Sequence, residues 1–413
     1  MADRDGRGIT TRSLHTETQV SENAQRDFAV TVVRQLVDAG YTALWAGGCV
    51  RDYLLGRQPK DYDVATSATP AQVRQLFGHR RTLAVGESFG VIVVLGPKDA
   101  GQIEVATFRT DGQYLDGRRP ETVQFSTPQE DAQRRDFTIN GMFYDPLTER
   151  ALDFVGGEHD LAAGLLRAIG DPHARMQEDK LRMLRAVRFA ATFEFELDAN
   201  TADAVREMAE QIHVVSGERI AQELRRMLVD QHRHRAVTLC RELELLDEVL
   251  PELDPVTENP EEWQRLCGML QVLQQPRFPL AFATLLLSVV ERRTLENAPI
   301  TSDAGEIVVE IGKRLRLSNQ EIDDATWLLR HRDDLLNAPS LKLSALKRCL
   351  AEPLAVDLLA LMRARCLASD LALDDILFCE AFLHNTPAQE ICPPVLISGN
   401  ERINAGLKPG PQF

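Results

Sequence analysis

The segment 44–66, with the sequence LWAGGCVRDYLLGRQPKDYDVAT, constrains the fold more than any other part of this chain. Its apolar start ends in Gly47-Gly48, which predicts a strand followed by a glycine turn. Residues 50–54 have the spacing of a short amphipathic helix, and extended structure resumes at Asp61. The segment therefore predicts a strand, a tight turn, a short helix and a second strand.

Two acidic side chains share one face of the second predicted strand. Asp61 and Asp63 are two residues apart, and because successive strand residues point to opposite faces, both carboxylates point the same way. Carboxylate oxygens are ligands that Mg²⁺ prefers. The turn at Gly47 and Gly48 lets the backbone approach a ligand, and the helix after it favours phosphate. We expect phosphate and metal to meet here, although each pattern alone is more often an ordinary turn or a solvated strand end.

The composition limits the class of protein. A chain of 413 residues is long enough for roughly two to four domains. Its seven cysteines stand singly, without a Cys-x-x-Cys pair, so we expect neither a zinc site nor disulfides, and a reducing cytoplasmic location. A polar N-terminus and the lack of long apolar runs argue against export and membrane spanning. With a net charge of −15, an RNA partner would need local Arg and Lys patches.

Strand and helix patterns alternate up to about residue 155, and helical periodicity follows almost to the end. We therefore predict an α/β head followed by all-helical structure. The predicted helices and strands of the head, outside segment 44–66, are helices 28–39 and 70–77 and strands 82–85, 91–95 and 102–108. The predicted parts are a flexible N-terminal tail (1–24), the head (25–155), a helical neck (156–230), a helical body (231–340) and a helical tail (341–413).

Two further segments of the head carry candidate site residues. Glu104 lies on a predicted strand and is either a third carboxylate of the site or a solvated side chain. We expect Arg134 and Arg135 to lie at the start of a helix. They are either a basic pair on the surface or two permanently charged guanidinium groups that bind phosphate oxygens. Segment 110–120 is rich in Gly and charge, which predicts a mobile loop.

The neck contains a third group of candidates. Residues 171–189 predict one helix with an apolar arc on one side. On that helix Asp179 and Arg182 would lie about one turn apart, where an acceptor and a fork of donors can bond the edge of a single base. A surface ion pair is the common alternative. Ser216 is a plausible helix N-cap, and we expect the basic residues in 232–235 to be solvated.

These motifs together resemble those of the class II tRNA nucleotidyltransferases and bacterial poly(A) polymerases. Three matches carry the resemblance. The first is Gly-Gly-x-Val-Arg-Asp-x-x-Leu-Gly from residue 47, followed by Asp-x-Asp-x-x-Thr from residue 61. The second is Arg-Arg-Asp-Phe-Thr-x-Asn from residue 134, and the third is Glu-Asp-x-x-Arg-x-x-Arg-Ala-x-Arg-Phe from residue 178. Segment 110–120 resembles the family's flexible loop, which is linked there to the switch from C to A addition. Segment 396–411 resembles the family's tail, which continues in a final helix, so we expect that helix to be missing or the sequence to be truncated.

The resemblance implies a nucleotidyltransferase-fold head and transfer of nucleoside monophosphates from CTP and ATP to the 3′ end of tRNA, with Mg²⁺ as cofactor. In the family the aspartate and first arginine of the third motif read the incoming base, so this role falls on Asp179 and Arg182. The predicted site comprises the carboxylates Asp61 and Asp63, which would hold metal, with Glu104, and the nucleotide-binding residues Gly47, Gly48, Arg51, Arg135, Asn140, Asp179, Arg182, Arg185 and Arg188.

Alternatives remain within and outside this enzyme class. The proteobacterial poly(A) polymerases carry a Gly-x-Arg-Phe-x-Leu-x-His-like segment where this chain reads VGESFGV at 85–91, which favours CCA addition over poly(A) addition. A CC-only or A-only enzyme stays open. A non-catalytic RNA- or nucleotide-binding module would be indicated by the loss of Asp61 or Asp63, and both are present.

Overall fold

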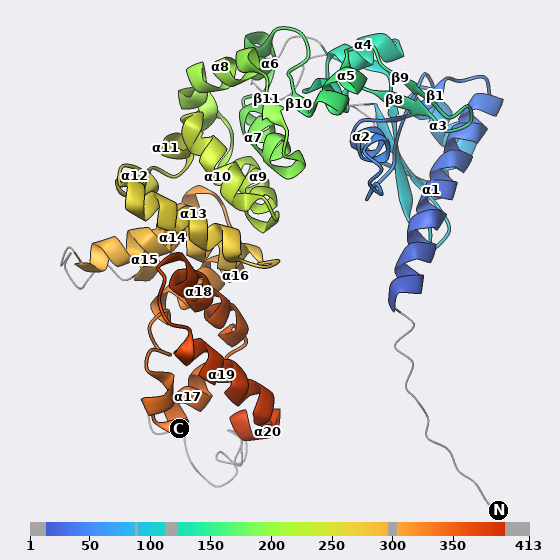
Figure 1. Ribbon diagram of the computed structural model, residues 1–413. Coiled ribbons are helices and arrows are strands. Elements are labelled where there is room, and N and C mark those ends of the chain that lie inside the picture. Colours follow the sequence, from blue (N-terminus) through green and yellow to red (C-terminus); the bar gives the residue numbers. More distant parts are fainter. Residues whose placement is uncertain (1–13, 87–89, 112–122, 296–303, 393–413) are drawn as a thin grey trace, which may run out of the picture. The chain divides into compact units, whose positions relative to one another are not determined.

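The computed structural model describes residues 14–86, 90–111, 123–295 and 304–392 (Figure 1). Contacts within the chain divide it into two compact units, Met1–Val215 and Ser216–Phe413. The predicted fold class is confirmed, because the first unit holds an α/β sheet and the rest of the described chain is helical. The boundary between the units falls inside the predicted neck, and the division into neck, body and tail stays a prediction. The segments 112–120 and 396–411 lie outside the described residues.

The first unit contains all the strands of the described chain. Its strands are β1 Ala43–Ala46, β2 Asp63–Thr66, β3 Thr82–Gly86, β4 Val91–Leu95, β5 Gln102–Thr107, β6 Arg109–Asp111, β7 Val123–Phe125, β8 Phe143–Asp145, β9 Arg150–Leu152, β10 Leu165–Leu166 and β11 Glu196–Leu197. Its helices are α1 Leu14–Asp38, α2 Gly48–Leu54, α3 Pro70–Phe77, α4 Pro128–Gln133, α5 Gly157–Ala163, α6 Pro172–Glu178, α7 Leu181–Phe193 and α8 Ala199–Glu207, with 3-10 turns η1 His79–Arg81, η3 Thr138–Asn140 and η4 Ala209–Val214.

A seven-stranded mixed sheet in the order β3-β4-β5-β2-β1-β8-β9 forms the centre of this unit. Its central neighbours β2 and β5 run parallel, whereas the other pairs are antiparallel. Helix α1 (blue in Figure 1) runs beside the sheet. It begins at Leu14, within the segment 1–24 that we expected to be a flexible tail. Two short strands after residue 160, β10 and β11, were also not predicted, because two-residue strands leave no periodic signal.

The two faces of the sheet pack against different helices. On one face the Arg26 guanidinium carbon of α1 lies 5.8 Å from the ring centre of Trp45. On the other face Ala65 of β2 belongs to the same buried cluster as Ala132 of α4. Since strand residues alternate between faces, Asp63 at the start of β2 shares the face of Ala65. The sheet therefore presents Asp63 on the side that α4 covers.

The second unit is helical throughout its described residues. Its helices are α9 Gly217–Val229, α10 Arg233–Glu242, α11 Leu245–Val249, α12 Asp254–Thr257, α13 Pro260–Val272, α14 Phe278–Leu295, α15 Ala304–Arg314, α16 Asn319–Arg330, α17 Leu343–Leu350, α18 Ala355–Ala368, α19 Asp374–Asn385 and α20 Ala388–Ile391, with 3-10 turns η5 Pro251–Leu253 and η6 Ala338–Ser340. Ser216 is the N-cap residue of α9, as predicted, although its side chain makes no capping hydrogen bond.

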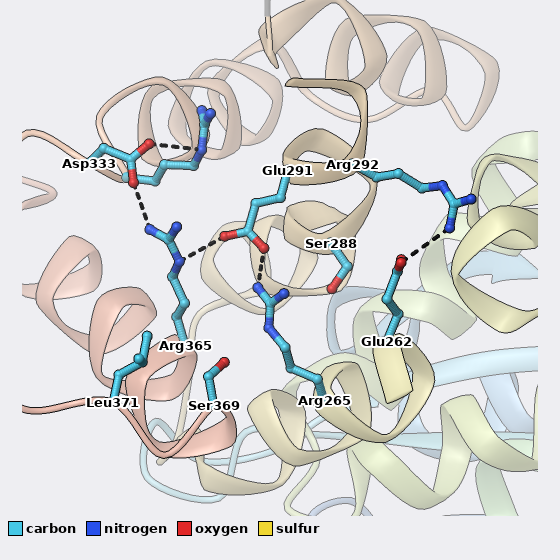
Figure 2. A pocket seen from close by; sticks show the side chains of 10 residues that line it. Glu262, Arg265, Ser288, Glu291, Arg292, Asp333, Arg365, Ser369 and Leu371 are labelled. Carbon is cyan, nitrogen blue, oxygen red and sulfur yellow. Dashed lines mark hydrogen bonds and ion pairs between the residues drawn. The ribbon is translucent and has the colours of Figure 1, made fainter. Parts of the chain in front are cut away.

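A pocket of about 390 Å³ in this unit is lined by ion pairs between helices (Figure 2). Arg365 of α18 contacts Glu291 of α14 through Nε at 2.7 Å and Asp333 through Nη1 at 2.6 Å. Arg265 of α13 contacts the same Glu291 carboxylate. These paired charges join three helices, and opposite charges compensate one another within the network.

Arg233 contradicts the prediction that the basic residues in 232–235 are solvated. Its side chain is fully buried, Nε donates to the Leu228 carbonyl at 2.9 Å, and Nη1 donates to the carbonyls of Leu270 and Leu273 at 3.1 and 2.7 Å. These carbonyls lie at the ends of α9 and α13, where helices lack internal donors for them. Arg233 therefore has a structural role as a cap of two helix ends.

The described residues also show the lengths of the helices and the state of the cysteines. None of the helices in the four described ranges is both long and apolar enough to cross a membrane. All seven cysteines have free thiols in this structure.

Candidate functional site

Asp63 and Glu104 lie side by side on the central parallel strands. They are register partners in the β2–β5 pair, and both are exposed, whereas Val64 and Val105 after them are buried. Asp61 lies in a bend just before β2, which begins at Asp63 and not at Asp61 as predicted. Asp61 is nevertheless exposed like Asp63. Glu104 and Asp63 therefore occupy neighbouring, solvent-exposed positions on one face of the sheet.

The charge around Asp63 suits a cation. Protein atoms surround the Asp63 carboxylate although solvent still reaches it, and this desolvation raises the pKa of Asp63 to about 6. The Glu104 and Asp61 carboxylates raise this pKa further, whereas Arg135 lowers it. Among the described residues, no three Asp, Glu, His or Cys side chains are arranged to hold a metal ion by themselves. Mg²⁺ commonly binds one or two protein carboxylates and completes its shell with substrate phosphates and water. The residues present fit that mode of binding.

The glycine turn between β1 and α2 brings an arginine close to the backbone. Gly47 has φ 73° and ψ −129°, torsions that residues with a Cβ rarely adopt. A Cβ on Gly47 would lie 2.8 Å from Nη1 of Arg135. The lack of a side chain at Gly47 therefore makes room for the Arg135 guanidinium, and Gly48 begins α2 directly after it.

Arg134 and Arg135 follow the C-terminal end of α4 and do not begin a helix, so this prediction was wrong. The capping box of Thr127 and Glu130 starts α4 at Pro128, which places the arginines where a helix end favours positive charge. Both guanidinium groups donate to Asp131.

A chain of hydrogen bonds joins α2 to α7. Nη1 of Arg51 donates to Oδ1 of Asn140 at 2.7 Å, Nδ2 of Asn140 donates to Oδ1 of Asp136 at 3.1 Å, and Nε of Arg185 donates to Oδ2 of Asp136 at 2.9 Å. Burial alone would raise the pKa of Asp136, but Arg185 and Asn140 hold it well below its usual range. Three predicted nucleotide-binding residues thus meet through Asp136, which sequence reasoning missed.

Three of the predicted arginines, on α2 and α7, lie close to the aromatic ring of Phe189. The guanidinium carbons of Arg188, Arg185 and Arg51 lie 4.0, 5.1 and 5.2 Å from the centre of its ring. Guanidinium groups are attracted to the negative face of an aromatic ring. The Phe189 ring therefore contacts guanidinium groups from both α2 and α7, which are far apart in the sequence.

Asp179 and Arg182 are not on one continuous helix, which corrects the prediction for residues 171–189. α6 ends at Glu178, and Asp179 has extended torsions of φ −149° and ψ 105°. Oδ1 of Asp179 accepts from the amide of Leu181, the first residue of α7, at 3.1 Å, and Lys180 is the N-cap residue of that helix. Arg182 is buried and donates through Nη1 to Glu178 and to the Arg175 carbonyl. The predicted single helix is therefore two helices, but the Arg182 amide donates to the Asp179 carbonyl at 3.0 Å, so the two residues still lie about one turn apart.

Comparisons with known proteins match this chain to one family. The model "Poly A polymerase head domain" matches residues 43–167, and the model "Probable RNA and SrmB- binding site of polymerase A" matches residues 194–257. The CCA-adding enzyme of Bacillus subtilis (strain 168) is 34% identical over 330 residues, which cover 78% of each chain. The chain belongs to the family of CCA-adding enzymes and poly(A) polymerases.

Both kinds of enzyme in this family are similar to the chain. Poly(A) polymerase I of Salmonella typhimurium is 39% identical over 266 residues, which cover 61% of this chain and 55% of that one. The matched part spans only 55 to 66% of the length of several curated CCA-adding enzymes. The crystal structure of the Bacillus stearothermophilus CCA-adding enzyme in complex with CTP superposes with a TM-score of 0.72 at 26% identity, covering 93% of this chain and 88% of that one.

Proposed function

We propose that this protein is a template-independent tRNA nucleotidyltransferase that adds C and A residues to the tRNA 3′ end from CTP and ATP and releases pyrophosphate. The observation that carries the proposal is the meeting of Asp63 and Glu104 with Arg135 at the turn of Gly47, within the part of the chain that matches the family's head model. Clustered carboxylates beside a fixed guanidinium suit a metal-bound triphosphate.

In this proposal Asp61 and Asp63 hold Mg²⁺, and Glu104 is a further catalytic carboxylate beside Asp63. When bound, Mg²⁺ would supply charge stabilisation for the phosphates and activation of the attacking hydroxyl. Arg135 binds the triphosphate as a fixed fork, next to the turn where Gly47 leaves space for it. Gly48 and Arg51 are further nucleotide contacts in this proposal, and a Cβ on Gly48 would lie 3.6 Å from Nη2 of Arg51.

Base selection is assigned to the start of α7. Asp179 accepts from the first amide of this helix, and the contacts of Arg182 with Glu178 and the Arg175 carbonyl fix the Arg182 guanidinium before a nucleotide arrives. A side chain already held in place loses less freedom when it binds a base, which improves discrimination. Asn140, Arg185 and Arg188 supply further nucleotide contacts in this scheme.

CCA addition is proposed ahead of poly(A) addition. The match with the Bacillus subtilis relative covers 78% of the length of that protein, which is named a CCA-adding enzyme. The solved structure with a TM-score of 0.72 has the same name. The Salmonella typhimurium relative supports poly(A) addition as the second candidate. We also propose a cytoplasmic location, because the proposed substrate is tRNA. The free thiols of all seven cysteines support this location, since the cytoplasm is reducing.

The test uses purified protein, Mg²⁺ and three transcripts of one tRNA, ending before C74, after C75 and after A76. Each is incubated with each NTP alone and with CTP plus ATP, and products are separated at single-nucleotide resolution. The proposal predicts two additions with CTP on the first transcript, one addition with ATP on the second, and none on the third. Long ATP-dependent products on all three would instead support poly(A) addition.

A further inference from the structure

Asp131 of α4 is a buried carboxylate that two arginines and one backbone amide share. Its side chain is about 1% exposed. Oδ2 accepts from Arg135 through Nε at 3.2 Å and Nη2 at 2.9 Å, while Oδ1 accepts from Arg134 through Nε at 2.9 Å and Nη2 at 2.7 Å. Oδ1 also accepts from the backbone N–H of Arg109 at 3.2 Å. A carboxylate with this many charge-assisted donors is held in one orientation.

The contacts of Asp131 determine which edge of Arg135 faces the turn. Asp131 occupies Nε and Nη2, so Nη1 is the end that reaches the carbonyl of Asn140 at 3.4 Å and lies beside Gly47. The guanidinium carbon also lies 5.1 Å from the ring centre of Phe143. Contacts on three sides thus leave one arrangement for the group that our proposal assigns to the triphosphate.

We infer that Asp131 is a positioning residue for nucleotide binding, which acts by holding Arg135 and rests on the proposed nucleotidyltransferase function. Because Arg135 would contact phosphates, which CTP and ATP share, Asp131 affects both nucleotides equally. A second route runs through the Arg109 amide, which begins β6. Arg109 directly precedes the segment that we expect to be linked to the switch from C to A addition. If Asp131 acted through Arg109, loss of its carboxylate would raise KM for ATP more than KM for CTP.

Steady-state kinetics of Asp131→Asn with tRNAs that accept only C or only A separate these routes. We expect KM for CTP and for ATP to rise by the same factor, about tenfold or more, because removing one charged hydrogen-bond partner weakens binding by about that much. We expect kcat to change less than about threefold. In an Arg135→Ala background, Asp131→Asn should add no further increase in KM.

The control for lost stability is Glu321→Gln, which removes the carboxylate that Arg225 contacts at 2.6 and 2.7 Å in the second unit. It should lower the melting temperature and leave KM for both nucleotides unchanged. If Asp131→Asn does not fold, Asp131→Glu keeps the charge but moves the carboxylate, and KM for both nucleotides should rise at least threefold. Wild-type KM values in the folded variant, an increase for ATP alone, or an additive effect with Arg135→Ala would overturn the inference. Absence of transfer by the wild-type protein would instead refute the proposed function.

Discussion

Replacing Gly47 with alanine should weaken nucleotide binding by a steric route that the structure specifies. The torsions of Gly47, φ 73° and ψ −129°, would strain an alanine by about 1 to 3 kcal/mol. The new Cβ would also lie 2.8 Å from Nη1 of Arg135, which must then move. Because Asp131 and the Asn140 carbonyl hold this guanidinium, moving it disrupts charged hydrogen bonds worth about 1.5 to 3 kcal/mol.

We therefore expect Gly47→Ala to lower the free energy of unfolding by about 1 to 3 kcal/mol. KM for CTP and ATP should rise roughly ten- to hundredfold, since each tenfold change in affinity corresponds to about 1.4 kcal/mol. Urea denaturation measures the first effect, and steady-state incorporation into tRNAs lacking A or CCA measures the second.

Gly78 provides the matched control. It has φ 84° and ψ 144°, also unfavourable for alanine, but a Cβ there would meet no atom within 4 Å. Gly78→Ala should destabilise the protein to a similar extent and leave both KM values unchanged. If Gly47→Ala and Gly78→Ala gave KM values within twofold of each other, the steric argument about Arg135 would be refuted.

Four further predictions concern the metal, base selection and the segment after β6. Asp61→Ala and Asp63→Ala should abolish transfer without unfolding the protein, because both residues are exposed; more than about a tenth of wild-type activity in both variants, a loss below about 1.4 kcal/mol, would contradict their role. EDTA should stop the reaction and excess Mg²⁺ should restore it, whereas activity that persists in EDTA would argue against a metal. Asp179→Ala and Arg182→Ala should reduce the preference for CTP and ATP over GTP and UTP by roughly tenfold, and an unchanged preference would mean that the base is read elsewhere. Deleting residues 112–117 should impair A addition more than C addition, and equal loss of both would exclude a switching role.

Local patterns in the sequence predicted the centre of the fold well. The strand, turn, helix and strand of segment 44–66 became β1, α2 and β2, because glycine and apolar spacing act over a few residues. The opposite faces of Glu104 and Val105 follow from the period of two in a strand. The error at Arg134 was avoidable, since Thr127 and Glu130 form a capping box that marks an earlier helix start.

Other features depend on contacts between residues far apart in the chain. Arg185 and Asp136 are 49 residues apart and meet only because α7 packs beside the residues that follow α4. Arg233 is the first residue of α10, and the pattern of that helix gives no sign that the Arg233 guanidinium caps two other helices. The break at Asp179 interrupts an apolar periodicity that continues across it, so periodicity predicted one helix where the backbone forms two.

Pyrophosphate release per tRNA tests the central claim most directly, because it counts the nucleotides transferred. With CTP and ATP in excess, the account predicts three pyrophosphates per tRNA that lacks CCA, one per tRNA that ends in CC, and none per complete tRNA. The Asp63→Ala variant should release none from any of them. Continued release from complete tRNA with ATP alone would contradict CCA addition, and equal release by Asp63→Ala would contradict the site.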